Sequence, residues 1–463
     1  EDALRFLATW QPGGDSFNGL SSRGLGNALA AIANEHEDFA ISLLDKGVQE
    51  AMAPAYLKAL LDGFFSAAEA KKVIPWECLV PSIIAVVQLS AESETVTEGQ
   101  QDAALQGERK LEDRWSEVVR ATANLIREGC AKNLIPNILA DDVWKYAELA
   151  VHSQLMWAGD RTSSQKNSIE EALTAALNTV GGNVVRMLID VALWDYRHGK
   201  ERVNSDIKQA PVSTKIVERL TPLLSYILIH QKDTALGAHA MLGHLIPQID
   251  FLVPQWTSAM EDQLFEMGAE DPGHHPIWGA YVTRANVYDS TFGKLRKWYL
   301  CAAEIAESSG EAEGQNTRDS DWSLTRGLAI HIIVGIIRGL SNVGDEDALV
   351  EKTFSNVPVK DRSYAYWEVF RGWSDSKDVI PEEYAQRIVS FWEWRLTELE
   401  GAPDTSERAD EADGLTWFLK TPYIPAVDAI RLGFRTLRLN SGKQRNRVTT
   451  WERLAELSKV DAA

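Results

Sequence analysis

The feature that most constrains the fold is the spacing of apolar residues, which recur every three or four positions along most of the chain. One such series is Val185, Leu188, Ile189, Ala192, Leu193 and Tyr196. This spacing puts all six side chains on one face of an α-helix and predicts an amphipathic helix packed on a core. The same period recurs in PAYLKALLDGFF, RWSEVVRATANLI, KIVERLTPLLSYIL and YAQRIVSFWEWRL.

Strand signals are scarce, and the connections between the periodic segments are short and contain Gly, Pro, Asn or Asp. Helices joined by short turns lie antiparallel to their neighbours, and helix pairs that cannot bury their apolar faces alone stack on one another. The sequence therefore predicts an all-α fold of degenerate helical hairpins stacked as an α-solenoid. No strict repeat period is present.

Three acidic, polar stretches interrupt the helical pattern, at residues 91–110, 306–321 and 401–414. Their composition is typical of exposed, mobile loops. We expect three segments: an N-terminal helical array over residues 1–160, central helical repeats with a Trp-centred hairpin over 161–310, and C-terminal helical repeats over 311–463.

Charge and cysteine content restrict the environment and the partners. Asp and Glu number 67 against 47 Lys and Arg, a formal net charge of −20 that repels nucleic-acid backbones and anionic membranes. The basic stretch at 431–447 is more typical of a charged helix face than of a contact with nucleic acid or an acidic partner. Three dispersed cysteines and the absence of a long apolar run fit a cytoplasmic protein. Because the chain begins at Glu1, we expect a piece of a longer protein.

Residues 178–198, NTVGGNVVRMLIDVALWDYRH, place two glycines before an apolar helical pattern. A phosphate loop requires GxxxxGK followed by Ser or Thr after a strand, and the chain contains no such motif. We expect Gly181 to end one helix in the left-handed conformation and Asn183 to cap the next. The pattern favours a turn between packed helices over an anion site.

Motifs for cofactors and metals are incomplete. Gly24 and Gly26 lack the third glycine of a dinucleotide fingerprint. His239 and His244 do not have the four-residue spacing that places two ligands on one helix face, and the pair His274–His275 is more typical of capping or packing. We predict no cofactor and no metal.

An all-α hydrolase is the enzymatic alternative. A glycosidase-like barrel needs two inward carboxylates in a cleft lined by aromatic rings, and the carboxylates next to Trp are Asp195, Asp321 and Glu393. Trp nevertheless recurs along the whole chain at helical spacing, as core residues do. We therefore favour a chain without catalytic activity.

Several segments, taken in order, resemble the C-terminal helical regions of large bacterial antiviral proteins. They are AALNTVGGNVVRMLIDVALWDYR (175–197), HPIWGAYVTRANVYDSTFGKLRKWYLCAA (275–303), LTRGLAIHIIVGIIRG (324–339), YAQRIVSFWEWRL (384–396) and LTWFLKTPYIPAVDAIRLGFRTL (415–437). In those proteins an effector such as a sirtuin-like NADase or a nuclease, sometimes with a signal-transduction NTPase module, precedes a long helical array. The likeness covers about residues 165–440, and the chain contains no effector or NTPase motif.

The resemblance implies a sensor region that binds an invader protein and controls an effector outside this chain. We expect a protein partner such as a phage protein, no nucleic acid, no membrane, and oligomerisation through the full-length protein. A surface of net charge −20 favours a basic partner. The candidate contact residues are aromatic residues in loop-like segments, although core packing competes for each: Trp278, Tyr281, Trp373 and Tyr423. A structural oligomerisation scaffold is the other alternative.

Overall fold

The computed structural model describes residues 22–50, 52–97, 115–157, 169–202, 211–229, 235–265, 275–312, 323–374, 381–421, 423–439 and 447–460. Every regular element within these ranges is a helix, and none of them is a strand. The predicted all-α fold is therefore confirmed. The chain divides into two compact units, here called unit 1 (residues 1–167 and 171–260) and unit 2 (residues 168–170 and 261–463).

The helices of unit 1, in chain order, are α2 (Ser22–Glu35), α3 (Glu37–Gln49), α4 (Pro54–Glu69), α5 (Trp76–Thr97), α6 (Trp115–Ala131), η2 (Asn137–Leu139), α7 (Ala140–His152), η3 (Gln154–Trp157), α8 (Ile169–Asn178, from Glu171), α9 (Val180–Arg202), α10 (Thr214–Ile229), α11 (Leu236–His244), α12 (Ile246–Leu252) and α13 (Pro254–Ala259). Those of unit 2 are α14 (Glu261–Phe265), α15 (Pro276–Arg284), α16 (Asp289–Lys294), α17 (Arg296–Ala312), α18 (Leu324–Arg338), α19 (Leu349–Asn356), α20 (Val359–Ser374), α21 (Glu382–Gly401), α22 (Ser406–Leu415), η6 (Thr416–Lys420), α23 (Ala426–Leu439) and α24 (Arg447–Val460).

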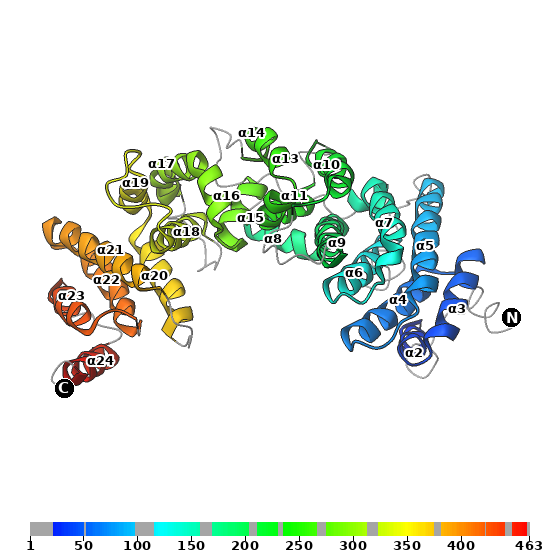
Figure 1. Ribbon diagram of the computed structural model, residues 1–463, viewed down its shortest axis with the longest axis horizontal. Coiled ribbons are helices and arrows are strands. Elements are labelled where there is room, and N and C mark those ends of the chain that lie inside the picture. The colour runs from blue at the N-terminus through cyan, green and yellow to red at the C-terminus, as the bar shows by residue number, and fades with distance from the viewer. Residues whose placement is uncertain are drawn as a thin grey trace. The chain divides into compact units, whose positions relative to one another are not determined.

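In unit 1 the long helices form two rows. One row consists of α2, α4, α6, α9 and α11, each packed against the next, and the other of α3, α5, α7 and α10 in the same manner. In Figure 1, α4, α6 and α9 lie below α5, α7 and α10. The apolar face of each helix is buried between the rows, which explains the helical period of the sequence.

Unit 2 packs along a similar path. Helices α15, α18, α20 and α22 pack successively, α17 packs on α19, and α21 lies between α18 and α23 (Figure 1). Helix α24 packs on α23 and on η6. The buried residues of this unit include several large aromatic side chains, among them Trp278, Trp392 and Tyr366.

An Ile-Pro pair precedes or opens several helices. The pairs are Ile74-Pro75 before α5, Ile135-Pro136 before η2 and α7, Ile246-Pro247 at the start of α12, Ile380-Pro381 before α21 and Ile424-Pro425 before α23. Proline suits this position because its fixed φ matches the helix and its missing N–H would have no partner in the first turn. The isoleucines at 74, 135, 246 and 424 are buried, so each anchors the start of its helix in the core.

Three helices end on a residue in the left-handed conformation. Lys71 after α4 has φ 55°, Asn133 after α6 has φ 58°, and Gly339 after α18 has φ 76°. In each case the next residue donates its N–H to a carbonyl five residues back, at 2.9, 2.8 and 2.8 Å respectively. This bond satisfies a terminal carbonyl and turns the chain sharply toward the following helix.

The double glycine differs from our expectation. Helix α8 ends at Asn178 and α9 begins at Val180, so Gly181 and Asn183 lie in the first turn of α9. The predicted left-handed conformation of Gly181 and the predicted N-cap role of Asn183 are therefore wrong. Thr179 takes the capping role, because its hydroxyl accepts the N–H of Gly182 at 3.2 Å.

Asn183 instead closes the end of α8. Its side-chain amide donates to the carbonyls of Leu177 at 3.2 Å and Thr179 at 2.7 Å. Gly182 is required by close packing, since a Cβ atom there would lie 1.9 Å from the carbonyl oxygen of Ala176. The two helices meet at 68°. In the ranges given above, no single helix is long and apolar enough to cross a membrane, although the bent pair α8–α9 passes that test by length and composition.

The three segments expected from the acidic stretches stay a prediction, and the helices group into the two units given above. The stretch at 306–321 joins α17 to α18, which pack on each other inside unit 2, so it connects helices within one unit. Most of it, and residues 98–110 of the first stretch, lie outside the described residues. The third stretch, 401–414, was expected to be a loop, but residues 406–415 form α22.

Candidate functional site

Trp278 and Tyr281 lie in the core rather than on the surface. The sequence HPIW looked loop-like, but Pro276 opens α15 and the His275 ring accepts the N–H of Trp278 at 3.3 Å as an N-cap. Both side chains are fully buried. Trp278 packs against Phe265 and Tyr299, with ring centroids 5.9 and 5.4 Å apart. The exposure that we expected of these two residues is therefore wrong, and the competing core interpretation explains them.

Tyr281 begins a buried chain of hydrogen bonds across unit 2. Its hydroxyl lies 2.8 Å from the Tyr299 hydroxyl, which lies 2.7 Å from Nδ1 of His331. Nε2 of His331 lies 3.1 Å from the carbonyl oxygen of Ala285. Because a carbonyl can only accept, Nε2 carries the proton, Nδ1 accepts from Tyr299, and Tyr299 accepts from Tyr281.

Burial keeps His331 and Tyr299 neutral. Desolvation lowers the pKa of His331 to about 4, although the bond to the Ala285 carbonyl opposes it. Desolvation also raises the pKa of Tyr299 well above its ordinary value, with the neighbouring Tyr281 as a second cause. All three side chains are buried, so the chain orders the core and does not face a ligand.

The other two predicted contact residues lie elsewhere in unit 2. Trp373 belongs to α20, but its side chain lies outside the described residues. Tyr423 lies in the turn between η6 and α23 and is half-buried.

A buried charged cluster, not predicted from the sequence, surrounds Glu411 on α22. Its carboxylate accepts from Nε and Nη2 of Arg395 at 2.5 and 3.0 Å, from Nη2 of Arg362 at 2.7 Å and from the Tyr366 hydroxyl at 3.0 Å. Burial alone would lower the pKa of Arg395, but the bonds to Glu411 outweigh it and raise this pKa. The helix that carries Glu411 could have been recognised from Thr405, whose hydroxyl accepts the Arg408 N–H at 3.2 Å and caps α22, but no local pattern indicates the ion pairs.

The carboxylates considered for a hydrolase have structural partners. Asp195 accepts from the indole N–H of Trp144 at 2.8 Å. Glu393 forms ion pairs with Arg431 at 2.5 Å and Arg435 at 3.4 Å. Asp321 lies outside the described residues. No group of three or more His, Cys, Asp or Glu side chains in the described part of the chain could hold a metal ion.

An exposed apolar surface lies on α23 and α24. Val427 is 59% exposed, Phe434 45% and Trp451 48%. Val427 and Phe434 are seven residues apart, so they share one face of α23. The Phe434 and Trp451 rings are in contact, with centroids 6.1 Å apart at 67°. We call these three residues the apolar patch. Trp451 is the one exposed side chain among the tryptophans that the structure describes.

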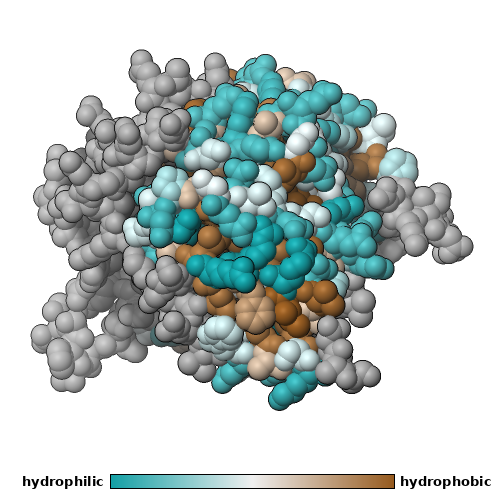
Figure 2. Space-filling view, turned by 90° about the vertical axis from the view of Figure 1, so that its left-hand side faces the viewer, coloured by the Kyte–Doolittle hydropathy of each residue, from teal (hydrophilic) through white to brown (hydrophobic). Residues whose placement is uncertain are grey.

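Arginines border the apolar patch. Arg431, between Val427 and Phe434 on α23, bonds to Glu393 at 2.5 Å and to Asp428 at 3.0 Å. Arg435 bonds to Glu400 at 2.8 Å. Figure 2 shows the side of the molecule on which α21, α23 and α24 lie, and hydrophobic residues gather there between hydrophilic ones. The surface thus combines aromatic rings with guanidinium groups held in fixed positions.

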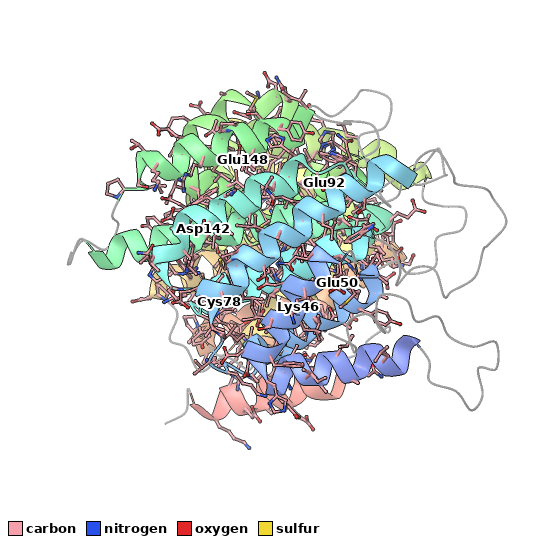
Figure 3. All side chains as sticks on the ribbon, turned by 90° about the vertical axis from the view of Figure 1, so that its right-hand side faces the viewer. Lys46, Glu50, Cys78, Glu92, Asp142 and Glu148 are labelled. Atoms are coloured by element: carbon pink, nitrogen blue, oxygen red, sulfur yellow. The ribbon has the colours of Figure 1, made fainter. Side chains whose placement is uncertain are left out.

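The surface of unit 1 formed by α3, α5 and α7 is different in kind. Figure 3 shows these three helices side by side, and their exposed charged side chains are mostly acidic. The labelled residues are Lys46 on α3 and Glu50 directly after it, Cys78 and Glu92 on α5, and Asp142 and Glu148 on α7. All six are exposed. Part of the net negative charge of the chain is therefore concentrated on this face.

Comparison with known proteins adds no relative: no family model, no curated protein and no solved structure matches this chain.

Proposed function

We propose that this chain is an α-solenoid that recognises another protein, and that the apolar patch on α23 and α24 is the contact surface. The observation that carries the proposal is the exposure of Trp451 and Phe434, at 48% and 45%. Exposed Trp residues are costly in water and are enriched among the residues that dominate binding energy in protein interfaces.

The packing order supports the solenoid part of the proposal. Within unit 1 alternate helices form two rows in which each helix contacts the next of its own row. Hairpin repeats stack in this manner, since each pair completes the apolar core of the pair before it. The recurring Ile-Pro pairs at helix starts are the kind of residual signature expected of degenerate repeats.

The composition of the patch favours a protein over a small molecule or a nucleic acid. Phe434, Trp451 and Val427 offer apolar area on the outside of two helices, and Arg431 and Arg435 on its border are already held by carboxylates. Arginines fixed in this way act as pre-ordered donors toward backbone carbonyls or side chains of a partner, and lose less entropy on binding. A partner helix with apolar residues on one face fits such a surface.

The resemblance to C-terminal regions of bacterial antiviral proteins suggests the identity of the partner. On this proposal the chain is the non-enzymatic sensor end of a cytoplasmic defence protein, and the partner is a phage protein. Binding would control an effector that is not part of this chain.

The test uses the purified chain as bait in lysates of infected and uninfected bacteria, followed by mass spectrometry. The wild-type chain is expected to capture one phage protein stoichiometrically, and the double variant Phe434→Ala, Trp451→Ala is expected to lose it. Phe39→Ala is the matched control, because Phe39 is 60% exposed on α3 of the other unit. Equal capture by the double variant would refute the role of the patch. Absence of any phage protein across several unrelated phages would refute the sensor role.

A further inference from the structure

Three contacting aromatic rings of unit 2 are accessible to solvent. Trp367 on α20 and Trp417 on η6 have ring centroids 6.4 Å apart, and the two elements pack on each other. The ring of Tyr364, also on α20, lies 4.9 Å from that of Trp367. All three side chains are partly exposed. We call these three residues the tryptophan surface.

A lysine lies over one of these rings. Lys420 ends η6, three positions after Trp417, and a 3₁₀ helix has about three residues per turn, so the two side chains leave the same side of the helix. The Nζ atom of Lys420 lies 3.6 Å from the centroid of the Trp417 ring. An indole face attracts a cation at this distance, which holds the ammonium in a defined position.

Lys420 differs from the other cations that lie over aromatic rings in the described part of the chain, because each of those also forms an ion pair with a carboxylate. They are Arg219, Lys297, Arg326, Arg371, Arg387 and Arg395. Among the described residues, the Lys420 ammonium has neither an ion pair nor a hydrogen bond.

The missing counter-charge matters because Lys420 is partly withdrawn from water. Burial lowers the pKa of Lys420, and no neighbouring carboxylate opposes this effect. Lys297 is the matched case: its Nζ atom lies 4.8 Å from the Trp298 ring centroid, but its bond to Asp262 at 2.8 Å raises its pKa. A partly desolvated ammonium without a partner costs free energy, which a bound anion would recover.

We propose that the tryptophan surface and Lys420 bind an acidic peptide segment of a partner protein. An Asp or Glu side chain of the segment pairs with the Lys420 ammonium, and a neighbouring apolar side chain packs on Trp417 and Trp367. The single charge of the ammonium matches the single charge of a carboxylate, and partly exposed tryptophans are typical contact residues of protein interfaces.

The surroundings of Lys420 favour a carboxylate over a phosphate. A phosphoryl group carries nearly two charges, and a nucleic-acid strand presents a row of phosphates, so each needs several free cations. The other cations over these rings are Arg371 and Arg326, and they are already paired with Glu368 and Asp361. The cations also cover ring faces on which a base would stack.

The experiment is a selection from a displayed library of random short peptides, run in parallel on the purified wild-type chain and on Lys420→Gln. We expect the peptides that only the wild type enriches to contain Asp or Glu beside an apolar residue. Unspecific attraction to a chain of net charge −20 would enrich Lys and Arg instead.

One such acidic peptide, labelled with fluorescein, is then titrated by fluorescence anisotropy. Binding is expected to weaken about tenfold or more in Lys420→Gln. Lys297→Gln is the matched control, because it removes a lysine that already has a carboxylate partner, and its affinity is expected to equal that of the wild type. The double variant Phe434→Ala, Trp451→Ala is also expected to bind normally, since the tryptophan surface contains no residue of the apolar patch.

A double-mutant cycle tests the contact itself. Replacing the acidic residue of the peptide by its amide is expected to weaken binding to the wild type as much as Lys420→Gln does, with little further effect on that variant. Independent, additive losses would overturn the proposal, because the carboxylate and the ammonium would then not be in contact. Enrichment of the same peptides by the wild type and by Lys420→Gln would overturn it as well. Neither result bears on the apolar patch or on a phage protein.

Discussion

The buried hydrogen-bond chain of unit 2 predicts a specific dependence of stability on pH. His331 is neutral in the folded chain because desolvation lowers its pKa to about 4, whereas an unfolded histidine titrates near ~6.5. Between these values the unfolded state binds a proton that the folded state does not. The contribution of neutral His331 to the free energy of unfolding is therefore fully present above about pH 6.5. It decreases as the pH falls from about 6.5 to about 4, and His331 causes no further loss below about pH 4.

The size of the effect follows from the two pKa values. Linkage gives a loss of about 2 kcal/mol between pH 7 and pH 5 from His331 alone. The assay is urea unfolding followed by tryptophan fluorescence at both pH values, in the wild type and in His331→Gln. Because other groups titrate in the same range, the quantity to compare is the difference between the two proteins in their change of unfolding free energy. His36→Gln, at an exposed histidine, controls for loss of an imidazole elsewhere.

The result that would refute this argument is an equal loss of stability from pH 7 to pH 5 in the wild type and in His331→Gln. It would mean that His331 is already protonated in the folded chain or is accessible to water. In the first case Tyr299 could not donate to Nδ1, and the direction of the whole hydrogen-bond chain would be reversed.

Two further predictions concern single side chains. Glu411→Gln is expected to lower the free energy of unfolding by about 3–5 kcal/mol, because it leaves two buried arginines without their carboxylate. Glu393→Gln, which affects exposed ion pairs, is expected to lower it by less than about 1 kcal/mol. Similar losses in urea titrations of the two variants would contradict this expectation. Gly182→Ala is expected to cost more than about 2 kcal/mol in the same assay, since its Cβ would lie 1.9 Å from the Ala176 carbonyl oxygen. Gly199→Ala on the same helix has no atom within 4 Å of the new Cβ and is expected to be neutral or stabilising, so equal effects would count against the packing argument.

The helical fold could be predicted because it depends on a local signal. Apolar spacing of three and four residues is set by the geometry of a single helix, and the series from Val185 to Tyr196 indeed lies within α9. The boundary between α8 and α9 could not be derived in the same way. Gly181 satisfies the rule for a helix end, but Thr179 caps the next helix first, and Gly182 is dictated by an approach to Ala176 that only the folded chain reveals.

The candidate contact residues depended on exposure, which is a property of the tertiary structure. HHPIW contains two histidines and a proline and resembles a loop, yet proline is also the preferred first residue of a helix, and Trp278 follows it into the core. The stretch at 401–414 was judged by its acidity, although one carboxylate in it, Glu411, neutralises two arginines from other helices. Buried ion pairs join residues far apart in sequence, and no local pattern announces them.

The surfaces of this chain also show why its net charge is a poor guide to its partner. A formal charge of −20 favours a basic partner at long range, but at physiological salt the field of exposed charges decays over about 8 Å. The exposed charged side chains of α3, α5 and α7 are mostly acidic, whereas the apolar patch is bordered by Arg431 and Arg435. A ligand of either surface therefore meets a local field that differs from the average. For this reason the binding experiments are designed around particular side chains and not around the overall charge.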